Sequence, residues 1–181
     1  NTCNISLVNI MKLPQPRKII AEKYVAGLSL FKSRRSPIKL SANESALGPS
    51  PKAVKSYSSI GKGFVRYPDS DGTYFRKVLA KKFKLKRDRI ILGSGSDQIF
   101  ELVCKLFLNK EDEVIVPEYS FIIYRIYSRM FGAKVKYAKE ENFKPSVQSI
   151  LDQVSRKTKI VFLANPNNPT GTYLDKFEIL K

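Results

Sequence analysis

From about residue 40 onward, short apolar and β-branched runs alternate with segments in which apolar residues recur at helical spacing. The helical spacing predicts helices over 51–60, 72–85, 97–108, 121–131 and 147–154. Short apolar runs predict strands over 89–92, 113–116 and 159–164, and alternation of polar and apolar residues predicts one over 134–138. The continuous apolar run at 159–164 is typical of a strand buried on both faces. Strands and helices that alternate in this way predict an α/β layer around a mostly parallel sheet.

Individual residues predict how some of these elements begin and which face they bury. Ser50 and Pro51 favour a helix start, with Ser50 as the cap and Pro51 in the first turn. In the third helix, the helical spacing places Ile99, Val103 and Leu106 on one side.

The two ends of the sequence carry weaker signals. Before residue 40 the chain is an arm interrupted by Pro and Ser. The sequence opens with Asn1, whereas Met11-Lys12-Leu13-Pro14 has the pattern of a natural N-terminus. We therefore expect the true start at Met11 and the preceding residues outside the folded protein. Residues 175–181 have the pattern of the first turns of a helix.

Composition predicts a soluble, cytoplasmic globular protein. Hydrophobic residues make up 43% of the 181 residues, which is enough for a core, and no run approaches the ~20 apolar residues of a membrane span. The cysteines are Cys3, expected in a tail, and Cys104, expected as a small buried hydrophobe on a helix. Two such residues are no disulfide framework and fit a reducing compartment.

The net charge of +17 is concentrated in the first half, where residues 1–90 hold 20 Lys and Arg against 5 Asp and Glu. The segment 76–89 holds eight basic residues and one acid, a pattern that nucleic-acid-binding proteins also show. A protein of that class would bind with an affinity that falls steeply with salt. However, Phe75, Leu79 and Phe83 recur at helical spacing through it, which indicates the solvated face of an amphipathic helix. We therefore expect neither nucleic acid nor membrane as a partner.

Two turns are candidates for ligand binding. Gly93–Asp97 opens a predicted helix, where close-approaching backbone, free N–H groups and the helix dipole favour an anion. It matches neither a P-loop nor a dinucleotide fingerprint, so a plain turn capped by Ser96 or Asp97 explains it as well. Asn165–Gly171 holds two prolines and a glycine directly after an apolar strand, where open α/β sheets place ligands.

Four motifs together resemble a known family. Asn-Pro-Asn-Asn-Pro-Thr-Gly at 165–171 resembles the asparagine-proline loop of fold-type I aminotransferases. The segments 39–51, 66–69 (Arg-Tyr-Pro-Asp) and 93–97 (Gly-Ser-Gly-Ser-Asp) are similar to motifs of histidinol-phosphate aminotransferases. The resemblance covers about residues 17–181. It implies a fold-type I, aspartate aminotransferase-like fold that binds pyridoxal 5'-phosphate, with an N-terminal arm and part of a small domain over 1–36 and an incomplete large domain over 37–181.

The resemblance also implies site residues. Backbone N–H groups of Ser96 and Asp97 would hold the cofactor phosphate, Tyr119 would stack on the pyridine ring, and Asn168 would bind the ring's phenolic oxygen. Tyr67 would reach the cofactor phosphate of a neighbouring subunit, which implies a homodimer. The alternatives are a buried core residue for Tyr119 and a turn residue packed before Pro68 for Tyr67.

On the substrate side, the resemblance places Asn43 and Glu44 at the pocket and lets Tyr24 close over the substrate, although Tyr24 is equally explained as a lone aromatic of the arm. The sequence departs from the family pattern at Ser45-Ala46, where Asn-Pro is usual. This change removes a proline constraint from the substrate loop.

No catalytic residue is expected in this chain, because the family's Schiff-base lysine, ring-nitrogen aspartate and substrate arginines follow the asparagine-proline loop and would lie beyond Lys181. No metal is expected. The implied reaction transfers an amino group between L-glutamate and imidazole acetol phosphate in L-histidine biosynthesis, and the chain alone is expected to show no turnover. Rival functions are an aromatic aminotransferase, a threonine-phosphate decarboxylase or a non-catalytic truncated remnant. Open sheet edges and uncovered apolar faces are also expected.

Overall fold

The computed structural model describes residues 22–25 and 38–181, so the expected start at Met11 and the tail residue Cys3 lie outside the described residues. The chain forms two compact units. Of the described residues, unit 1 holds Glu22 and 104–181, and unit 2 holds 23–25 and 38–103.

Unit 2 is helical. It contains α1 (Pro51–Ser59), the 3-10 helix η1 (Gly61–Val65), α2 (Thr73–Phe83), the 3-10 helix η2 (Arg87–Arg89) and the beginning of α3 (Gly95–Phe107). The helices predicted over 51–60 and 72–85 are therefore confirmed. Ser50 stands at the cap position of α1 and Pro51 in its first turn, as predicted, although the Ser50 side chain makes no capping hydrogen bond. Pro51 favours the helix start by itself, because its fixed φ suits the first turn and it has no N–H to satisfy.

The strand predicted over 89–92 is not formed. Arg89 ends η2, and Ile90 is extended, with φ −118° and ψ 123°. Among the described residues no strand pairs with this segment, and an extended backbone becomes a strand only through hydrogen bonds to a neighbour. Leu92 instead packs close to Gly72, where an added Cβ would overlap its Cδ1 atom.

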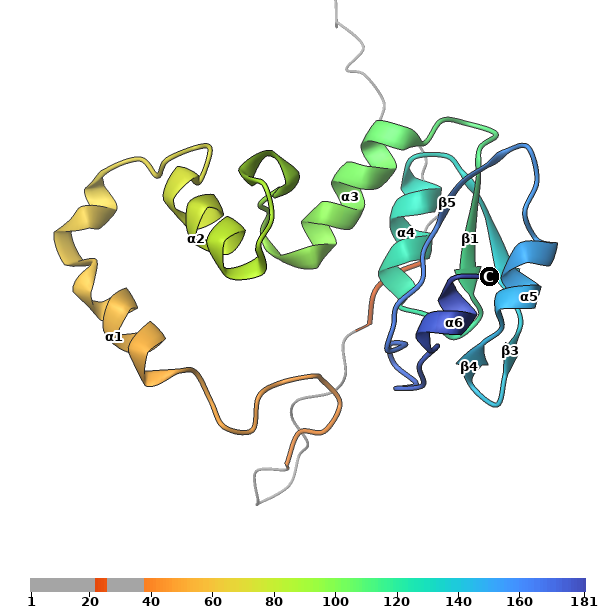
Figure 1. Cartoon of the computed structure of the whole chain (residues 1–181), viewed down its shortest axis with the longest axis horizontal. Helices are drawn as coiled ribbons and strands as arrows, with labels where there is room; N and C mark the ends of the chain where they lie inside the picture. Colours follow the sequence, from red (N-terminus) through yellow and green to blue (C-terminus); the bar gives the residue numbers. More distant parts are fainter. Residues whose placement is uncertain (1–21, 26–37) are drawn as a thin grey trace, which may run out of the picture. The chain divides into compact units, whose positions relative to one another are not determined.

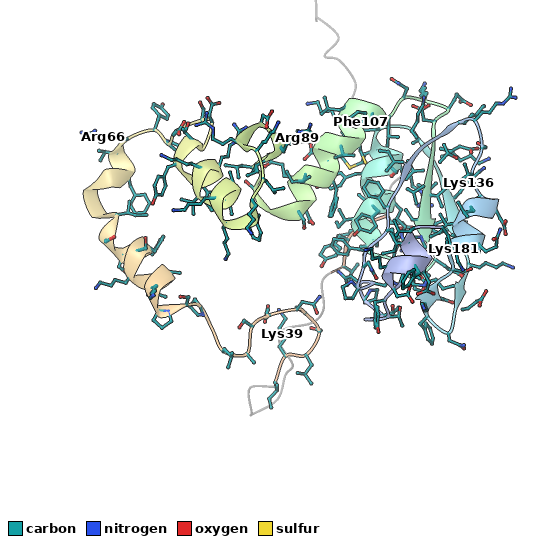
Figure 2. The ribbon with its side chains drawn as sticks, in the orientation of Figure 1. Lys39, Arg66, Arg89, Phe107, Lys136 and Lys181 are labelled. Atoms are coloured by element: carbon teal, nitrogen blue, oxygen red, sulfur yellow. The ribbon has the colours of Figure 1, made fainter. Side chains whose placement is uncertain are left out.

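The apolar face of α2 has the predicted helical spacing but is largely uncovered. Phe75 and Phe83 are exposed and Leu79 is half-buried. None of the side chains described in 38–103 is buried, which agrees with the expected uncovered apolar faces. Figure 2 shows the side chains of this unit, with Arg66 and Arg89 labelled.

The helix α3 confirms the one predicted over 97–108, but the side that carries Ile99, Val103 and Leu106 is not evenly buried. Leu106 is 74% exposed, whereas Ile99 and Val103 are half-buried and Cys104 is fully buried. Positions 104 and 106 point in nearly opposite directions on a helix, and Cys104 is the one that contacts Ser128. Cys104 is thus the small buried hydrophobe that the sequence predicts.

Unit 1 is built on a three-stranded parallel sheet in the order β2-β1-β5, with β1 (Glu113–Pro117) between β2 (Lys134–Ala138) and β5 (Thr158–Val161). The helices α4 (Ile122–Met130) and α5 (Val147–Asp152) follow β1 and β2 and confirm the helices predicted there. A short antiparallel pair, β3 (Glu140–Glu141) and β4 (Lys144–Pro145), separates β2 from α5. The chain closes with α6 (Lys176–Ile179), which Asp175 and Glu178 start with a capping box.

The core of unit 1 lies along β1, which is buried over its whole length. Ile115 packs with Ala138 and Ile150, and Leu163 lies against this cluster. The strand predicted over 159–164 is shorter than expected and is not buried on both faces, since Val161 is 43% exposed. The reason is its place in the sheet, because β5 is an edge strand among the described residues.

The connections of this sheet create a point where the chain changes direction. The chain leaves β1 through α4 to β2, then crosses back through α5 to β5 on the other side of β1. Right-handed crossovers in opposite directions put α4 and α5 on opposite faces, as Figure 1 shows. The neighbouring strands β1 and β5 therefore flank a topological switch point, where α/β sheets bind ligands beyond the carboxyl ends of their strands.

Within the described ranges, no helix is long and apolar enough to cross a membrane. The same part of the chain holds no group of three or more His, Cys, Asp or Glu that could bind a metal ion.

Candidate functional site

Two loops of unit 1 leave the sheet at the switch point. The loop after β1 carries Tyr119, and the loop after β5 carries the segment Asn165–Gly171. Since β1 and β5 are parallel neighbours, both loops start from the same edge of the sheet. The sequence-predicted turn at 165–171 is confirmed, and it lies where a ligand site is expected.

The asparagine-proline loop is closed by its own hydrogen bonds. Asn165 Nδ2 donates to the carbonyl of Leu174 over 2.9 Å, and Leu174 N–H donates back to Asn165 Oδ1 over 2.8 Å. The backbone N–H of Asn167 donates to the Thr172 carbonyl, and Gly171 N–H donates to the Asn167 carbonyl. These bonds give the loop a defined shape without involving Asn168.

Asn168 itself is half-buried, and its side chain makes no hydrogen bond with any residue that the structure describes. The neighbouring Asn167 is 3% exposed, and its Nδ2 atom donates to Thr170 Oγ1 over 3.0 Å. Of the three loop asparagines, Asn165 and Asn167 thus hold the loop together. The Asn168 amide keeps its donor capacity for a ligand.

Tyr119 is not the core residue that one interpretation of the sequence expected. It is 45% exposed, and its ring lies 5.5 Å from the ring of Phe143, tilted by 53°. Its backbone N–H donates to Glu140 Oε1 over 3.1 Å. A half-exposed aromatic ring at a sheet edge offers a flat surface on which a planar ligand can stack.

Glu140 joins the two loops, and the sequence analysis did not identify it. In addition to the Tyr119 N–H, its Oε1 accepts a hydrogen bond from Asn167 Nδ2 over 3.4 Å. Burial, the largest cause, raises the pKa of the Glu140 carboxyl group; the nearby Glu118 charge also raises it, against the two hydrogen bonds. The available signal was an acidic residue just after β2, the other neighbour of β1.

In unit 2, the start of α3 has the features of an anion site. The helix begins at Gly95, so Ser96 and Asp97 lie in its first turn and neither is the cap that the alternative interpretation required. The first N–H groups of a helix have no partner inside it, and the helix dipole adds positive charge there. Gly95 has φ +77°, which a residue with a side chain adopts only with strain.

The other predicted site residues also lie in unit 2 and are open to solvent. Tyr67 is 99% exposed and therefore not packed before Pro68, and Tyr24 is 52% exposed. Asn43 and Glu44 are exposed, and Glu44 Oε1 forms an ion pair with Lys39 Nζ at 2.8 Å. The structure thus brings the Tyr119 loop and the Asn168 loop together in unit 1. Convergence of these loops with the α3 amides stays a prediction.

Comparison with known proteins connects these features to one family. The sequence is similar to the histidinol-phosphate aminotransferases of Pelagibacter ubique, 50% identical over 170 residues, and Paramagnetospirillum magneticum, 39% identical over 173 residues. Each comparison covers 94% of this chain and 47% or 48% of the relative. The chain therefore spans about half the length of the curated relatives it matches.

Solved structures show the same fold. A histidinol-phosphate aminotransferase from Sinorhizobium meliloti, solved in complex with pyridoxal-5'-phosphate, matches with a TM-score of 0.73 at 21% identity, over 77% of this chain and 38% of that one. An aromatic aminotransferase from Pyrococcus horikoshii matches with a TM-score of 0.66 at 25% identity, over 74% of this chain and 39% of that one. The predicted fold-type I architecture is confirmed. The family model for aminotransferase class I and II matches residues 35–181, and the chain belongs to this family.

Proposed function

We propose that this chain is the N-terminal half of a pyridoxal-phosphate-dependent aminotransferase that moves an amino group between L-glutamate and imidazole acetol phosphate in L-histidine biosynthesis. The reaction class is supported by the family, and the substrate by the similarity to relatives named for histidinol phosphate. The observation that carries the proposal is the switch point between β1 and β5, where the Tyr119 loop and the asparagine-proline loop meet through Glu140.

The residues present fit the chemistry of this cofactor. A phosphorylated pyridine offers a flat ring, a phenolic oxygen and a dianionic phosphate. Tyr119 supplies a half-exposed aromatic surface, Asn168 an amide donor that no described residue uses, and the first turn of α3 a set of N–H groups. When bound, the cofactor supplies the electron sink that amino-group transfer requires.

The roles of individual residues follow from these groups. Tyr119 would orient the ring by stacking, and the Asn168 Nδ2 group would donate to the phenolic oxygen. The N–H groups of Ser96 and Asp97 would hold the phosphate at the positive end of the α3 dipole. In each case the residue binds or orients the cofactor, because the base that moves the proton is expected to be a lysine outside this chain.

Three further parts of the proposal concern the assembled enzyme. Tyr67, which is fully open to solvent, would reach the phosphate bound by a second subunit of a homodimer. Asn43, Glu44 and Tyr24 would line the substrate pocket. The division into an arm with part of a small domain over 1–36 and a large domain over 37–181 belongs to the same proposal, as does the cytoplasmic location.

The test uses the full-length protein that contains this sequence, supplied with pyridoxal 5'-phosphate. We expect conversion of histidinol phosphate and 2-oxoglutarate to be faster, in kcat/KM, than conversion of phenylalanine and 2-oxoglutarate by at least about 100-fold. A preference for phenylalanine would contradict the substrate assignment and retain the reaction class. Absence of any amino-group transfer would contradict the whole proposal. The 181-residue chain alone is the control, and we expect no turnover from it.

A further inference from the structure

We propose that Glu140 is a positioning residue for the cofactor ring, because its carboxyl group couples the loop that carries Tyr119 to the loop that carries Asn168. The inference rests on the proposed function, since it takes Tyr119 and Asn168 as the residues that hold the ring. It adds a residue outside the four motifs on which the family resemblance depends.

Both arms of the coupling end on the same oxygen atom. Glu140 Oε1 accepts from the Tyr119 backbone N–H over 3.1 Å and from Asn167 Nδ2 over 3.4 Å. Asn167 is buried, and its own backbone is bonded to Thr172 and Gly171 within the asparagine-proline loop. A movement of the Glu140 carboxyl group is therefore transmitted to the stacking residue and to the residue directly before Asn168.

The backbone around Glu140 is held by bonds other than those of its own carboxyl group. Glu140 pairs with Pro145 in the β3–β4 ladder. Just before it, the Ala138 carbonyl accepts from Glu118 N–H over 3.0 Å, and Lys139 N–H donates to Ser149 Oγ over 2.7 Å. The carboxyl group thus extends from a fixed point of the fold, which suits an anchor for the two loops.

The arrangement is unfavourable for stability alone. Glu140 Oε2 and Asn167 Oδ1 are buried and have no hydrogen-bond partner among the described residues. Burial also raises the pKa of the Glu140 carboxyl group, which shows that its charged form is disfavoured there. A half-buried acid with a buried, unsatisfied oxygen lowers stability relative to an apolar residue of similar shape. Retaining such a group is typical of a functional site.

The experiment compares Glu140→Ala, Glu140→Gln and a matched control, Glu141→Ala, in the full-length protein. Glu141 is the exposed neighbour of Glu140 on β3. The readouts are the dissociation constant of pyridoxal 5'-phosphate, visible-range circular dichroism of the bound cofactor and the thermal midpoint. We expect Glu140→Ala to raise the dissociation constant about tenfold and to weaken the dichroism signal. Glu140→Gln keeps the accepting oxygen, so it should stay within about threefold of wild type.

The outcomes separate positioning from a merely structural role. If Glu140→Ala lowers the thermal midpoint but leaves cofactor affinity and dichroism at the wild-type and Glu141→Ala values, the proposal is overturned. An equal loss in Glu140→Gln and Glu140→Ala contradicts the role of the accepting oxygen and also overturns it.

A second measurement does not depend on the cofactor. Hydrogen exchange of the peptide over residues 118–121, in the protein without cofactor, should be about tenfold faster in Glu140→Ala than in wild type, because Tyr119 N–H loses its acceptor. Unchanged exchange overturns the coupling. If wild type binds no cofactor while exchange responds as expected, the proposed function and the positioning role fail, whereas the link between Glu140 and the Tyr119 loop stands.

Discussion

The side chain of Asn165 and the backbone of Leu174 are joined by a reciprocal pair of hydrogen bonds. Nδ2 donates to the Leu174 carbonyl over 2.9 Å, and Leu174 N–H donates to Oδ1 over 2.8 Å. Leu174 is 3% exposed, so its backbone groups have little access to water as a replacement partner. The pair joins the two ends of the asparagine-proline loop and leaves the Asn168 side chain available to a ligand.

Asn165→Ala should therefore destabilise the protein. It removes both bonds and strands the N–H and carbonyl groups of the buried Leu174, so we expect the free energy of unfolding to fall by about 2 kcal/mol. Urea unfolding of the full-length protein measures this. The matched control is Asn168→Ala, which should stay within about 0.5 kcal/mol of wild type and yet weaken cofactor binding. Equal destabilisation by the two variants would contradict this division of roles.

Ser96→Pro tests the predicted phosphate site at the start of α3. Proline is tolerated in the first turn of a helix but has no N–H, so the change removes one proposed phosphate donor while keeping the helix. We expect the dissociation constant of pyridoxal 5'-phosphate to rise about tenfold, with unchanged far-ultraviolet circular dichroism. Ser96→Ala is the control, since it removes only the hydroxyl group. If both variants bind the cofactor like wild type, the Ser96 amide does not hold the phosphate.

The Glu113 carboxylate predicts a defined pH dependence. Glu113 Oε2 lies 2.7 Å from Lys136 Nζ (Figure 2 labels Lys136) and accepts a hydrogen bond of 2.6 Å from the Ser155 hydroxyl group. The contact with Lys136 is the largest cause, followed by the bond from Ser155, that lowers the pKa of Glu113 below its ordinary value of 4.5. An acid with a lowered pKa in the folded state stabilises the protein above its unfolded pKa, and this contribution is lost as the pH falls through the folded pKa.

Glu113→Gln should consequently be less stable than wild type near neutral pH, with the difference shrinking as the pH falls below about 4.5. Urea unfolding midpoints of both proteins at a series of pH values, from about 7 to about 3, test this sign. A difference that stays constant on acidification would show that the charge of Glu113 is not what stabilises this corner of the sheet.

Gly72 and Gly48 separate steric overlap from backbone strain. Both have positive φ, +55° and +70°, but an added Cβ would overlap Leu92 Cδ1 at Gly72 and meets nothing within 4 Å at Gly48. Gly48→Ala should cost about 1 kcal/mol of strain, and Gly72→Ala about 1 to 3 kcal/mol more. Urea unfolding of both variants gives the difference. Equal losses would mean that Leu92 moves aside freely.

The elements that the sequence predicted well are those with a local cause. The strand at 134–138 has the predicted bounds, and α4 and α5 start within one residue of the predicted positions, because alternation and helical spacing are visible over a few residues. The wrong predictions concern features that depend on distant parts of the chain. The strand at 89–92 needs a hydrogen-bonded neighbour, and the burial of Val161 depends on whether β5 lies inside the sheet or at its edge.

The candidate site divides in the same way. The four motifs were sufficient for a resemblance to a family that implies the cofactor, because rigid turns and helix starts are encoded by the residues that form them. Glu140 was not found, since nothing near it in the sequence refers to Tyr119, 21 residues before it, or to Asn167, 27 residues after it.

The sequence by itself determined the alternation of strands and helices, the asparagine-proline turn and the family to which the chain belongs. The tertiary structure decided which strand is central, where the chain reverses direction around β1, and which side chain connects the loops after β1 and β5. The physical reason is range: backbone propensity and turn chemistry act between near neighbours in the chain, whereas burial and the hydrogen bonds of Glu140 exist only after separate strands have paired.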